Sequence, residues 1–252
     1  MLAAQRKDLL LERLGRDGRI VAKDFAAEFR VSEDSIRRDL RELAEAGLCQ
    51  RVYGGALPVS PAVADYSTRK TVAVDSKTRV AATAAALIEP GSAVILDGGT
   101  TALAVARALP LSLEATVITH SPTIAAALGE HPSIELFLIG GRIFKHSMVA
   151  SGAAAVEAAQ AVTADIFLLG VTGVHHEAGL TTGDADEAAM KRALSRRAAE
   201  TYVLASSEKL GAASRFPVLP LQDVTAVITD AKAANRAVRD LEAAGVRVLG
   251  AS

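Results

Sequence analysis

The spacing of hydrophobic and polar residues divides the 252-residue chain into two parts. In the first 60 residues, hydrophobic side chains recur every three or four positions, as they do in amphipathic helices. Further along the chain, short hydrophobic runs alternate with alanine-rich segments of helical length. The first pattern predicts a small helical unit. The second predicts a larger α/β unit, and the chain is long enough for both.

One helix in the first part carries the clearest signals. Ile36, Leu40 and Leu43 form a hydrophobic stripe, and Ser32 is suited to cap the first turn of the helix that contains them. Gly47 is expected to end this helix. Its polar side carries three arginines, so we expect one face to pack against the protein and the other to face a partner.

Two helices are predicted before it. The first spans Leu2–Leu14, with Gly15 and Gly18 around its end. The second spans Ala22–Phe29 and is separated from the arginine-bearing helix by little more than Arg30 and Val31. Two helices joined by so short a turn are typical of a helix-turn-helix, in which the second helix enters the major groove of DNA.

A hairpin is predicted immediately after these helices. Residues 48–59 alternate between polar and hydrophobic positions and contain Gly54-Gly55, which we expect to supply the turn. An arginine-bearing helix alone is more often a solvated face, but the unbroken order of capped helix, short turn, basic helix and hairpin favours a winged helix-turn-helix. We expect Ser35 and Arg38 to reach base edges and Arg37 and Arg41 to reach phosphates. The expected DNA-binding residues are Ser32, Ser35, Arg37, Arg38, Arg41, Arg51, Tyr53 and Gly54.

The rest of the chain alternates between predicted strands and helices. Most of the strands are hydrophobic throughout, which is typical of parallel strands buried on both faces. The predicted strands are Ala93–Leu96, Ala115–Thr119, Ile134–Ile139, Asp165–Leu169, Thr201–Leu204, Val224–Thr229 and Val246–Leu249. The predicted helices are Val80–Ile88, Ala102–Leu109, Thr123–Leu128, Ala153–Ala161, Asp186–Glu200 and Ala233–Ala244. Together they predict a mostly parallel sheet covered by helices.

A proline-containing stretch, Pro58–Pro61, separates the two patterns, so we expect domains at 1–60 and 61–252. Residues 1–56 contain 11 Lys and Arg against 10 Asp and Glu, a net charge of only +1. Because non-specific DNA affinity depends on phosphate neutralisation, one such unit should bind weakly. Useful affinity therefore calls for a homo-oligomer, a dimer or a tetramer.

Composition limits the classes of protein and the cellular compartments that remain. Cys49 is the single cysteine, and no Cys/His cluster has zinc spacing, so we expect no metal, no cofactor and a reducing compartment. The N-terminal residues are too charged for an export signal, and hydrophobic runs are too short to span a bilayer. We therefore expect a cytoplasmic protein without a membrane partner.

The loop Asp97-Gly-Gly-Thr-Thr101 is the strongest candidate for chemistry in the second part. In parallel α/β folds, ligands bind beyond the carboxyl ends of the strands, and this loop lies between a predicted strand and a predicted helix. Its glycines allow close approach of the backbone, while free N–H groups and the Thr100 and Thr101 hydroxyls suit an anion. The alternative is a simple tight turn capped by Thr101. His120 is of interest only because it follows the next strand, at the same expected edge.

The N-terminal motif resembles the DeoR-type (deoxyribonucleoside-repressor) family of bacterial transcriptional regulators. The similar residues run from Val31 to Gly47 and continue with Arg51 and Gly54-Gly55-Ala56. The chain departs from the family pattern at Tyr53, where histidine is frequent. The resemblance implies a winged helix-turn-helix that binds double-stranded operator DNA, joined to a domain that senses a small metabolite, usually a phosphorylated sugar.

The resemblance extends over nearly the whole chain. It implies a sensor domain with the fold of sugar-phosphate isomerases and coenzyme A transferases, which use the same loops for substrate. Departures occur at His120, where asparagine is usual, and at Ser206, where aspartate is usual. The effector-binding residues expected from the loops and from the resemblance are Lys77, Asp97, Gly98, Gly99, Thr100, Thr101, His120, Ser121, Gly141, Glu187, Lys191 and Lys209.

Two other functions were weighed. In a sugar-phosphate isomerase-like enzyme with a fused DNA-binding domain, carboxylates and histidine would transfer protons beside a sugar carbonyl. Such an enzyme would use Asp97, His120, Asp184, Glu187 and Lys209, but its chemistry needs no winged helix. RNA binding is poorly supported, because aromatic residues make up only 4% of the chain and no stacking platform is visible. We therefore expect a transcriptional repressor of carbohydrate genes with no catalytic residues.

Overall fold

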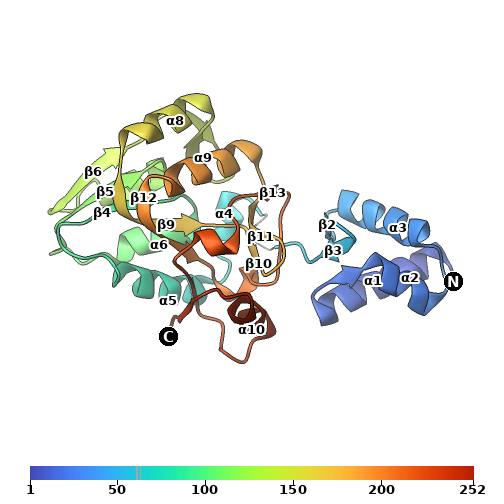
Figure 1. Cartoon of the computed structure of the whole chain (residues 1–252). Coiled ribbons are helices and arrows are strands. Elements are labelled where there is room, and N and C mark those ends of the chain that lie inside the picture. The colour runs from blue at the N-terminus through green and yellow to red at the C-terminus, as the bar shows by residue number, and fades with distance from the viewer. Residues whose placement is uncertain (61, 63) are drawn as a thin grey trace.

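The N-terminal unit of the protein is a three-helix bundle with a short wing (Figure 1). The structure is a computed structural model and describes residues 1–60, 62 and 64–252. Leu10, Phe25, Ile36 and Leu40 form the centre of its hydrophobic core. The elements are α1 (Ala3–Asp17), β1 (Ile20–Val21), α2 (Ala22–Phe29), α3 (Glu33–Glu45), β2 (Gln50–Val52) and β3 (Gly55–Leu57).

Two details of this unit differ from the sequence prediction. Helix α1 continues through Gly15 to Asp17, and Gly18, with a φ of 73°, ends it. In the wing, Tyr53 and Gly54 form the two-residue turn, since Val52 pairs with Gly55. Gly55 is needed for another reason: a Cβ there would lie 1.7 Å from the backbone oxygen of Ile20 in the neighbouring strand β1. The first glycine therefore makes the turn and the second allows close strand packing.

The second unit is built on a seven-stranded sheet in the order β15-β14-β12-β9-β4-β5-β6. Every neighbouring pair is parallel. The seven strands correspond to the seven predicted hydrophobic runs. They are β4 (Ala93–Leu96), β5 (Ala115–Thr119), β6 (Ile134–Leu138), β9 (Ala164–Gly170), β12 (Ala198–Leu204), β14 (Ala226–Thr229) and β15 (Val248–Gly250).

Helices cover both faces of this sheet. On one face α5, α6 and α7 pack in a core that includes Val80, Leu103 and Ile124. On the other face α8, α9 and α10 pack in a core that includes Met190 and Leu241. The bounds are α5 (Val74–Ala85), α6 (Thr100–Ala108), α7 (Pro122–Leu128), α8 (Ala153–Ala158), α9 (Ala185–Ser195) and α10 (Arg236–Ala243). The predicted α/β fold is confirmed as three layers.

The prediction of a helix over Asp186–Glu200 was wrong at its end. Helix α9 stops at Ser195, and Ala198–Glu200 already pair with β9. The stretch reads as helix because it is rich in alanine and charge, but pairing within the sheet overrides that local preference. Short strands were also missed: β7 (Arg142–Phe144), β8 (Val149–Ser151), β10 (Gly173–His175), β11 (Gly179–Thr182) and β13 (Phe216–Pro217).

Few contacts join the two units beyond the chain itself. Val59 forms an isolated bridge with Ala213, and Arg19 pairs with Glu177 at 2.8 Å. The expected linker lies here, although its Pro61 falls outside the described residues. After it comes the short helix α4 (Tyr66–Arg69). No helix in the described ranges is long and apolar enough to cross a membrane.

Candidate DNA-binding surface and effector pocket

Helix α3 begins as its sequence predicts. The Ser32 hydroxyl accepts a hydrogen bond from the Ser35 backbone N–H at 3.2 Å and lies 2.8 Å from the Ser35 hydroxyl. Arg38 and Arg41 are exposed, while Arg37, also exposed, is paired with Glu33 one turn earlier at 2.6 Å. The two expected base-reading residues therefore differ, because Ser35 is engaged in the cap and Arg38 extends freely.

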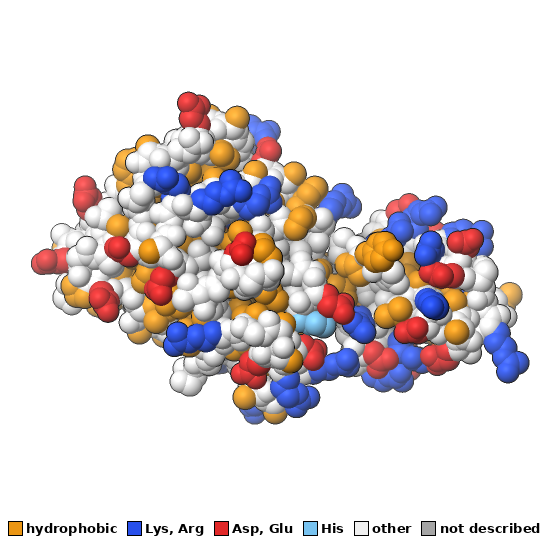
Figure 2. All heavy atoms as spheres, in the orientation of Figure 1, with side chains coloured by type: hydrophobic (Ala, Val, Ile, Leu, Met, Phe, Trp, Pro, Cys, Tyr) orange, Lys and Arg blue, Asp and Glu red, His pale blue; other side chains and the backbone are white. Residues whose placement is uncertain are grey.

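The wing presents the remaining expected DNA-binding residues. Arg51, Tyr53 and Gly54 are exposed, and the Tyr53 ring lies at the tip of the β2–β3 turn. Figure 2 shows Lys and Arg side chains interspersed with Asp and Glu over this unit, in keeping with its low net charge. Any DNA affinity must therefore come from local placement of a few arginines.

A buried ion pair fixes α3 to α1. Arg6 donates from Nε and a terminal nitrogen to both carboxylate oxygens of Asp39, the latter bond at 3.1 Å, and both side chains are buried. Bidentate arginine–carboxylate pairs restrict orientation as well as distance. This pair could not be predicted from the sequence, because two charged residues 33 positions apart give no local signal. Its effect is to set the angle at which the arginine-bearing face is presented.

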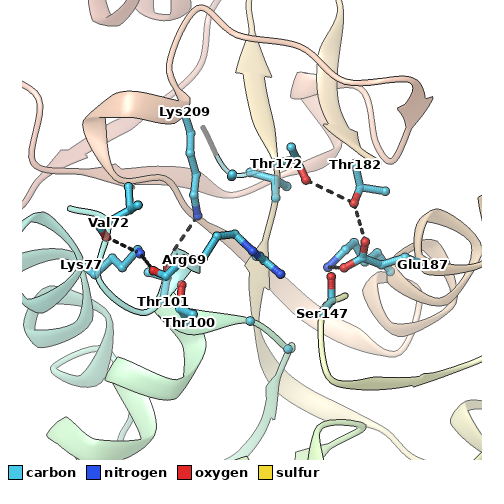
Figure 3. Close-up of a pocket in the computed structure, with 16 residues that line it drawn as sticks. Arg69, Val72, Lys77, Thr100, Thr101, Ser147, Thr172, Thr182, Glu187 and Lys209 are labelled. Carbon is cyan, nitrogen blue, oxygen red and sulfur yellow. Dashed lines mark hydrogen bonds and ion pairs between the residues drawn. The ribbon is translucent and has the colours of Figure 1, made fainter. Parts of the chain in front are cut away.

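A pocket lies in the second unit at the carboxyl edge of the sheet. The chain leaves β4 toward β5 on one side, whereas β9 and β12 continue on the other, so the order reverses between β4 and β9. Ligands bind at such switch points in open α/β sheets. The loops after β4 and β9 both line the pocket (Figure 3). Its lining residues are Ala62, Arg69, Val72, Lys77, Gly98, Gly99, Thr100, Thr101, Ser147, Gly170, Val171, Thr172, Thr182, Glu187, Lys191 and Lys209.

One side of the pocket is strongly basic. Helix α6 begins here after Gly99, whose φ of 96° favours glycine, so backbone N–H groups point into the site. Lys209 donates to the Thr101 hydroxyl at 3.2 Å, and burial lowers its pKa to about 8. Burial also lowers the pKa values of Lys77 and Arg69. Within the described residues, none of these three cations forms an ion pair.

The other side of the pocket carries a carboxylate network. Glu187 accepts a hydrogen bond from the Thr182 hydroxyl at 2.7 Å and lies 3.4 Å from the Lys191 ammonium. Burial alone would raise the pKa of Glu187, but Lys191 holds it below its usual range. Lys191 also contacts Asp97 at 2.5 Å, and these two carboxylates raise its pKa despite burial. This side therefore carries two carboxylates against one ammonium group, and it is suited to hydroxyl contacts.

Asp97 lies beneath the pocket rather than in its lining. Its side chain is fully buried and accepts hydrogen bonds from Lys191, His120 (2.8 Å) and the Gly170 backbone (2.9 Å). Burial would raise its pKa, but Lys191 and His120 hold it well below its usual range. Asp97, which was expected among the effector-binding residues, therefore does not face the pocket, because its oxygens already have partners within the protein. Asp97 instead ties β4 to β9.

Three further expected effector residues lie outside the lining. His120 uses both ring nitrogens, on Asp97 and on the Ala150 carbonyl (2.8 Å), and the Ser121 hydroxyl donates to the Met148 carbonyl. Gly141 adjoins Ala155. The remaining eight expected residues do line the pocket: Lys77, Gly98, Gly99, Thr100, Thr101, Glu187, Lys191 and Lys209. Eight lining residues were missed: Ala62, Arg69, Val72, Ser147, Gly170, Val171, Thr172 and Thr182, which come from the segment before α5, from the end of β9 and its following loop, and from other short strands and loops.

The protein joins a unit with an exposed arginine-bearing helix to an α/β unit with a separate basic pocket. This architecture is typical of a ligand-responsive DNA-binding protein. Comparison with known families agrees. Residues 6–62 match the DeoR-like helix-turn-helix domain, and residues 72–231 match the DeoR C terminal sensor domain. The chain belongs to the DeoR family of transcriptional regulators.

Full-length relatives support this assignment. The chain is 32% identical to the HTH-type transcriptional regulator GlpR of Haloferax volcanii, covering 99% of this chain and 98% of that protein. It is 32% identical to the HTH-type transcriptional repressor GlcR of Bacillus subtilis, with 96% and 93% covered. It is 30% identical to the glycerol-3-phosphate regulon repressor of Escherichia coli K12, with 92% of each covered.

The predicted function as a DNA-binding transcriptional regulator is therefore confirmed, and the isomerase-like enzyme is set aside, because these relatives are named regulators. Among solved structures, ribose 5-phosphate isomerase A from Methanocaldococcus jannaschii is similar over 54% of each chain, with a TM-score of 0.41 and 20% identity.

Proposed function

We propose that this protein represses genes of carbohydrate use in the cytoplasm and that a phosphorylated sugar-type effector in the pocket controls its affinity for operator DNA. One observation carries the proposal: Arg69, Lys77 and Lys209 converge on the start of α6 without a carboxylate partner in the described chain. Buried charges are normally paired or bind an ion. A dianionic phosphate supplies the missing negative charge.

The pocket also suggests how the two ends of such an effector would lie. Its phosphate would accept hydrogen bonds from the backbone at Thr100 and Thr101 and from Lys209. Its hydroxyl-bearing end would face Glu187 and Thr182, whose hydrogen-bonding groups lie on the opposite wall (Figure 3). The name of the Escherichia coli relative, a glycerol-3-phosphate regulon repressor, supports a small phosphorylated polyol or sugar.

We further propose that the protein acts as a homo-oligomer, with the domain boundary near residue 60. The DNA-binding unit has a net charge of only +1, so one copy neutralises few phosphates. Two copies held by the second unit would contact two half-sites about one helical turn apart. Light scattering of the full chain tests this: a monomer that binds its operator tightly would contradict it.

The effector proposal is tested by binding and DNA release together. An operator is first selected from random DNA by the full protein, and its affinity is measured with and without glycerol 3-phosphate, glucose 6-phosphate and fructose 1-phosphate. At least one should bind the protein and shift operator affinity, whereas the unphosphorylated compounds should not. Replacing Lys209 with methionine should remove the response, and the exposed Arg239→Met is the matched control. Absence of binding by every phosphorylated compound would refute the proposed effector class.

The DNA-reading proposal is tested with two arginines of α3. Arg38→Ala should cost ~1–3 kcal/mol on the selected operator and relax base preference, because Arg38 is exposed and has no ion-pair partner in the described structure. Arg37→Ala should weaken all DNA sequences to a similar, smaller extent, since Arg37 is already paired with Glu33. Fluorescence anisotropy on operator and scrambled DNA measures both. Equal operator binding by Arg38→Ala and the unmodified protein would remove Arg38 from the reading surface.

A further inference from the structure

The segment that joins the two units also covers the effector pocket. We call residues 65–73 the strap; they comprise α4 and the turn that leads into α5. Arg69 and Val72 of the strap line the pocket together with Ala62, just before it. In Figure 3 the Arg69 side chain reaches into the space between Lys209 and Glu187. The chain therefore cannot pass from the DNA-binding unit to α5 without crossing this pocket.

Lys77 holds the strap from inside the pocket. Its ammonium group donates to the backbone carbonyls of Arg69 and Val72, both at 2.5 Å. Arg69 in turn donates to the His146 carbonyl at 2.6 Å, while its Nε is buried without a hydrogen-bond partner in the described structure. A lysine that bonds only to carbonyls keeps its full charge uncompensated. The same ammonium is therefore available to an incoming anion.

The closed pocket has little room. Its cavity volume is about 30 Å³, and each water requires roughly 10–15 Å³ on such a measure. That is space for about two waters, not for a sugar phosphate. The other walls come from the loops after β4 and β9, from the turn between β7 and β8, from the end of β11, from α9 and from Lys209. Of these walls, the strap is the one that continues into the segment leading to the DNA-binding unit.

One anchor of the strap lies outside the pocket. The Tyr66 hydroxyl donates to the Thr123 hydroxyl in α7 at 3.0 Å, and neither residue lines the pocket. At the other end, Ala73 adopts a φ of 49°, a left-handed conformation that costs a non-glycine residue about 1–2 kcal/mol. A strained residue where the strap meets α5 is a natural point for the backbone to turn.

From these contacts we propose that the strap couples the pocket to DNA binding, a mechanism that rests on the effector proposed above. The phosphate of the effector forms an ion pair with Lys77, so the Lys77 ammonium group no longer donates to the two strap carbonyls. The phosphate also pairs with Arg69. The strap then moves outward. The DNA-binding unit moves with it, because only residues 58–64 separate the end of β3 from the strap. The contacts between the units that oppose this movement include the isolated Val59–Ala213 bridge, a hydrogen bond from Arg236 to the Asp17 carbonyl at 3.3 Å, and the exposed Arg19–Glu177 pair, and exposed ion pairs contribute little stability.

The mechanism predicts the direction in which the effector changes operator affinity. The protein binds its operator while the strap is closed. The effector therefore lowers operator affinity, and bound DNA reciprocally lowers effector affinity. Lys77 then has two separable roles, one as a phosphate ligand and one as a latch in the absence of ligand. Only the latch role affects the ligand-free protein.

The test uses the full chain without ligand first. Lys77→Met should lower ligand-free operator affinity at least ~5-fold, the lower end of usual coupling. Arg239→Met, at an exposed residue outside both the pocket and the strap, should leave ligand-free operator affinity within twofold. Tyr66→Phe, outside the pocket, should lower ligand-free operator affinity in the same direction as Lys77→Met by a smaller factor. Hydrogen–deuterium exchange should show faster exchange in peptides covering residues 65–78 in both strap variants.

Ligand is then added to the unmodified protein, with glycerol 3-phosphate and inorganic phosphate as probes. Binding should speed exchange over residues 65–78 and weaken operator binding. If a probe binds and releases DNA but strap exchange is unchanged, and Lys77→Met and Tyr66→Phe bind operator normally without ligand, the strap mechanism is overturned while the effector proposal stands. If Lys77→Met does not fold, the ligand-free operator affinity of Tyr66→Phe replaces it in this comparison. If neither these probes nor other sugar phosphates bind, both proposals fail.

Discussion

The two units bury arginine and lysine in opposite ways. In the DNA-binding unit, Arg6 is buried against both oxygens of Asp39, so charge and hydrogen bonds are satisfied within the protein. In the sensor unit, Lys77 and Lys209 are buried, and their partners among the described residues are hydroxyl and carbonyl oxygens. The first arrangement is complete and serves structure. The second is complete only with an external anion, which is why we assign function to it.

The largest expected effect comes from breaking the complete pair. Arg6→Met leaves the Asp39 carboxylate buried without its partner, which costs roughly 3–5 kcal/mol. Thermal and denaturant unfolding should show loss of the DNA-binding unit, with the sensor unit still folded. Operator binding should be lost with it.

Two controls separate a buried pair from a surface pair. Lys7→Ala on the same helix removes a more exposed pair with Glu42 and should lower stability far less than Arg6→Met does, because exposed pairs contribute little. The double variant Arg6→Met with Asp39→Leu should recover much of the lost stability, because no unpaired charge remains. A stable Arg6→Met single variant would show that Asp39 does not need its partner.

The second expected effect is a gain in stability rather than a loss. The pKa of Lys209 falls from 10.5 to about 8 through burial, which corresponds to a cost of about 3 kcal/mol at pH 7. Lys209→Met should therefore stabilise the ligand-free protein by roughly 1–3 kcal/mol while it abolishes the effector response. Sites built for ligands commonly reduce stability in this way.

The pH dependence of that gain follows from linkage. Between pH 8 and 10.5 the unfolded chain binds more protons at Lys209 than the native protein does, so native stability rises with pH and the advantage of methionine shrinks. Chemical unfolding at pH 7 and pH 9.5 measures this. A methionine variant less stable than the unmodified protein at pH 7 would mean that Lys209 is already satisfied internally.

The sequence predicted the scaffold better than the site. All seven sheet strands were found because buried parallel strands are hydrophobic along their whole length, as in Ala93–Leu96 and Ala115–Thr119. Helix α2 was located to the residue, since Ala22–Phe29 is bounded by short turns. Short strands such as β10 and β11 were missed, because glycine and threonine runs look like loops.

Within the site, prediction succeeded for residues next to a strand end and failed where contacts are long-range. Thr100 and Thr101 were found because they belong to the short loop and helix start that follow β4. Arg69 was missed because nothing local shows that the segment before α5 folds over the pocket. Asp97 was identified by its position after a strand, but only the fold reveals that Lys191, 94 residues away, contacts its carboxylate beneath the pocket.

The smallest effect that sharpens the comparison is the pH dependence of effector affinity. A phosphate monoester is a dianion above its second pKa near 6, and it binds best while Lys209 keeps its proton. With a Lys209 pKa of about 8, affinity should be nearly constant from about pH 6.5 to 7.5 and then fall toward tenfold per pH unit above 8. Arg69 and Lys191 stay charged in this range, because Arg69 is a guanidinium and the pKa of Lys191 is raised.

Calorimetry from pH 6.5 to 9.5 on the unmodified protein and Lys209→Arg provides the measurement, since arginine keeps its charge throughout. A decline above pH 8 that persists unchanged in Lys209→Arg would assign the titrating proton to Lys77 instead, and a flat profile in the unmodified protein would mean that neither lysine loses a proton where the phosphate binds.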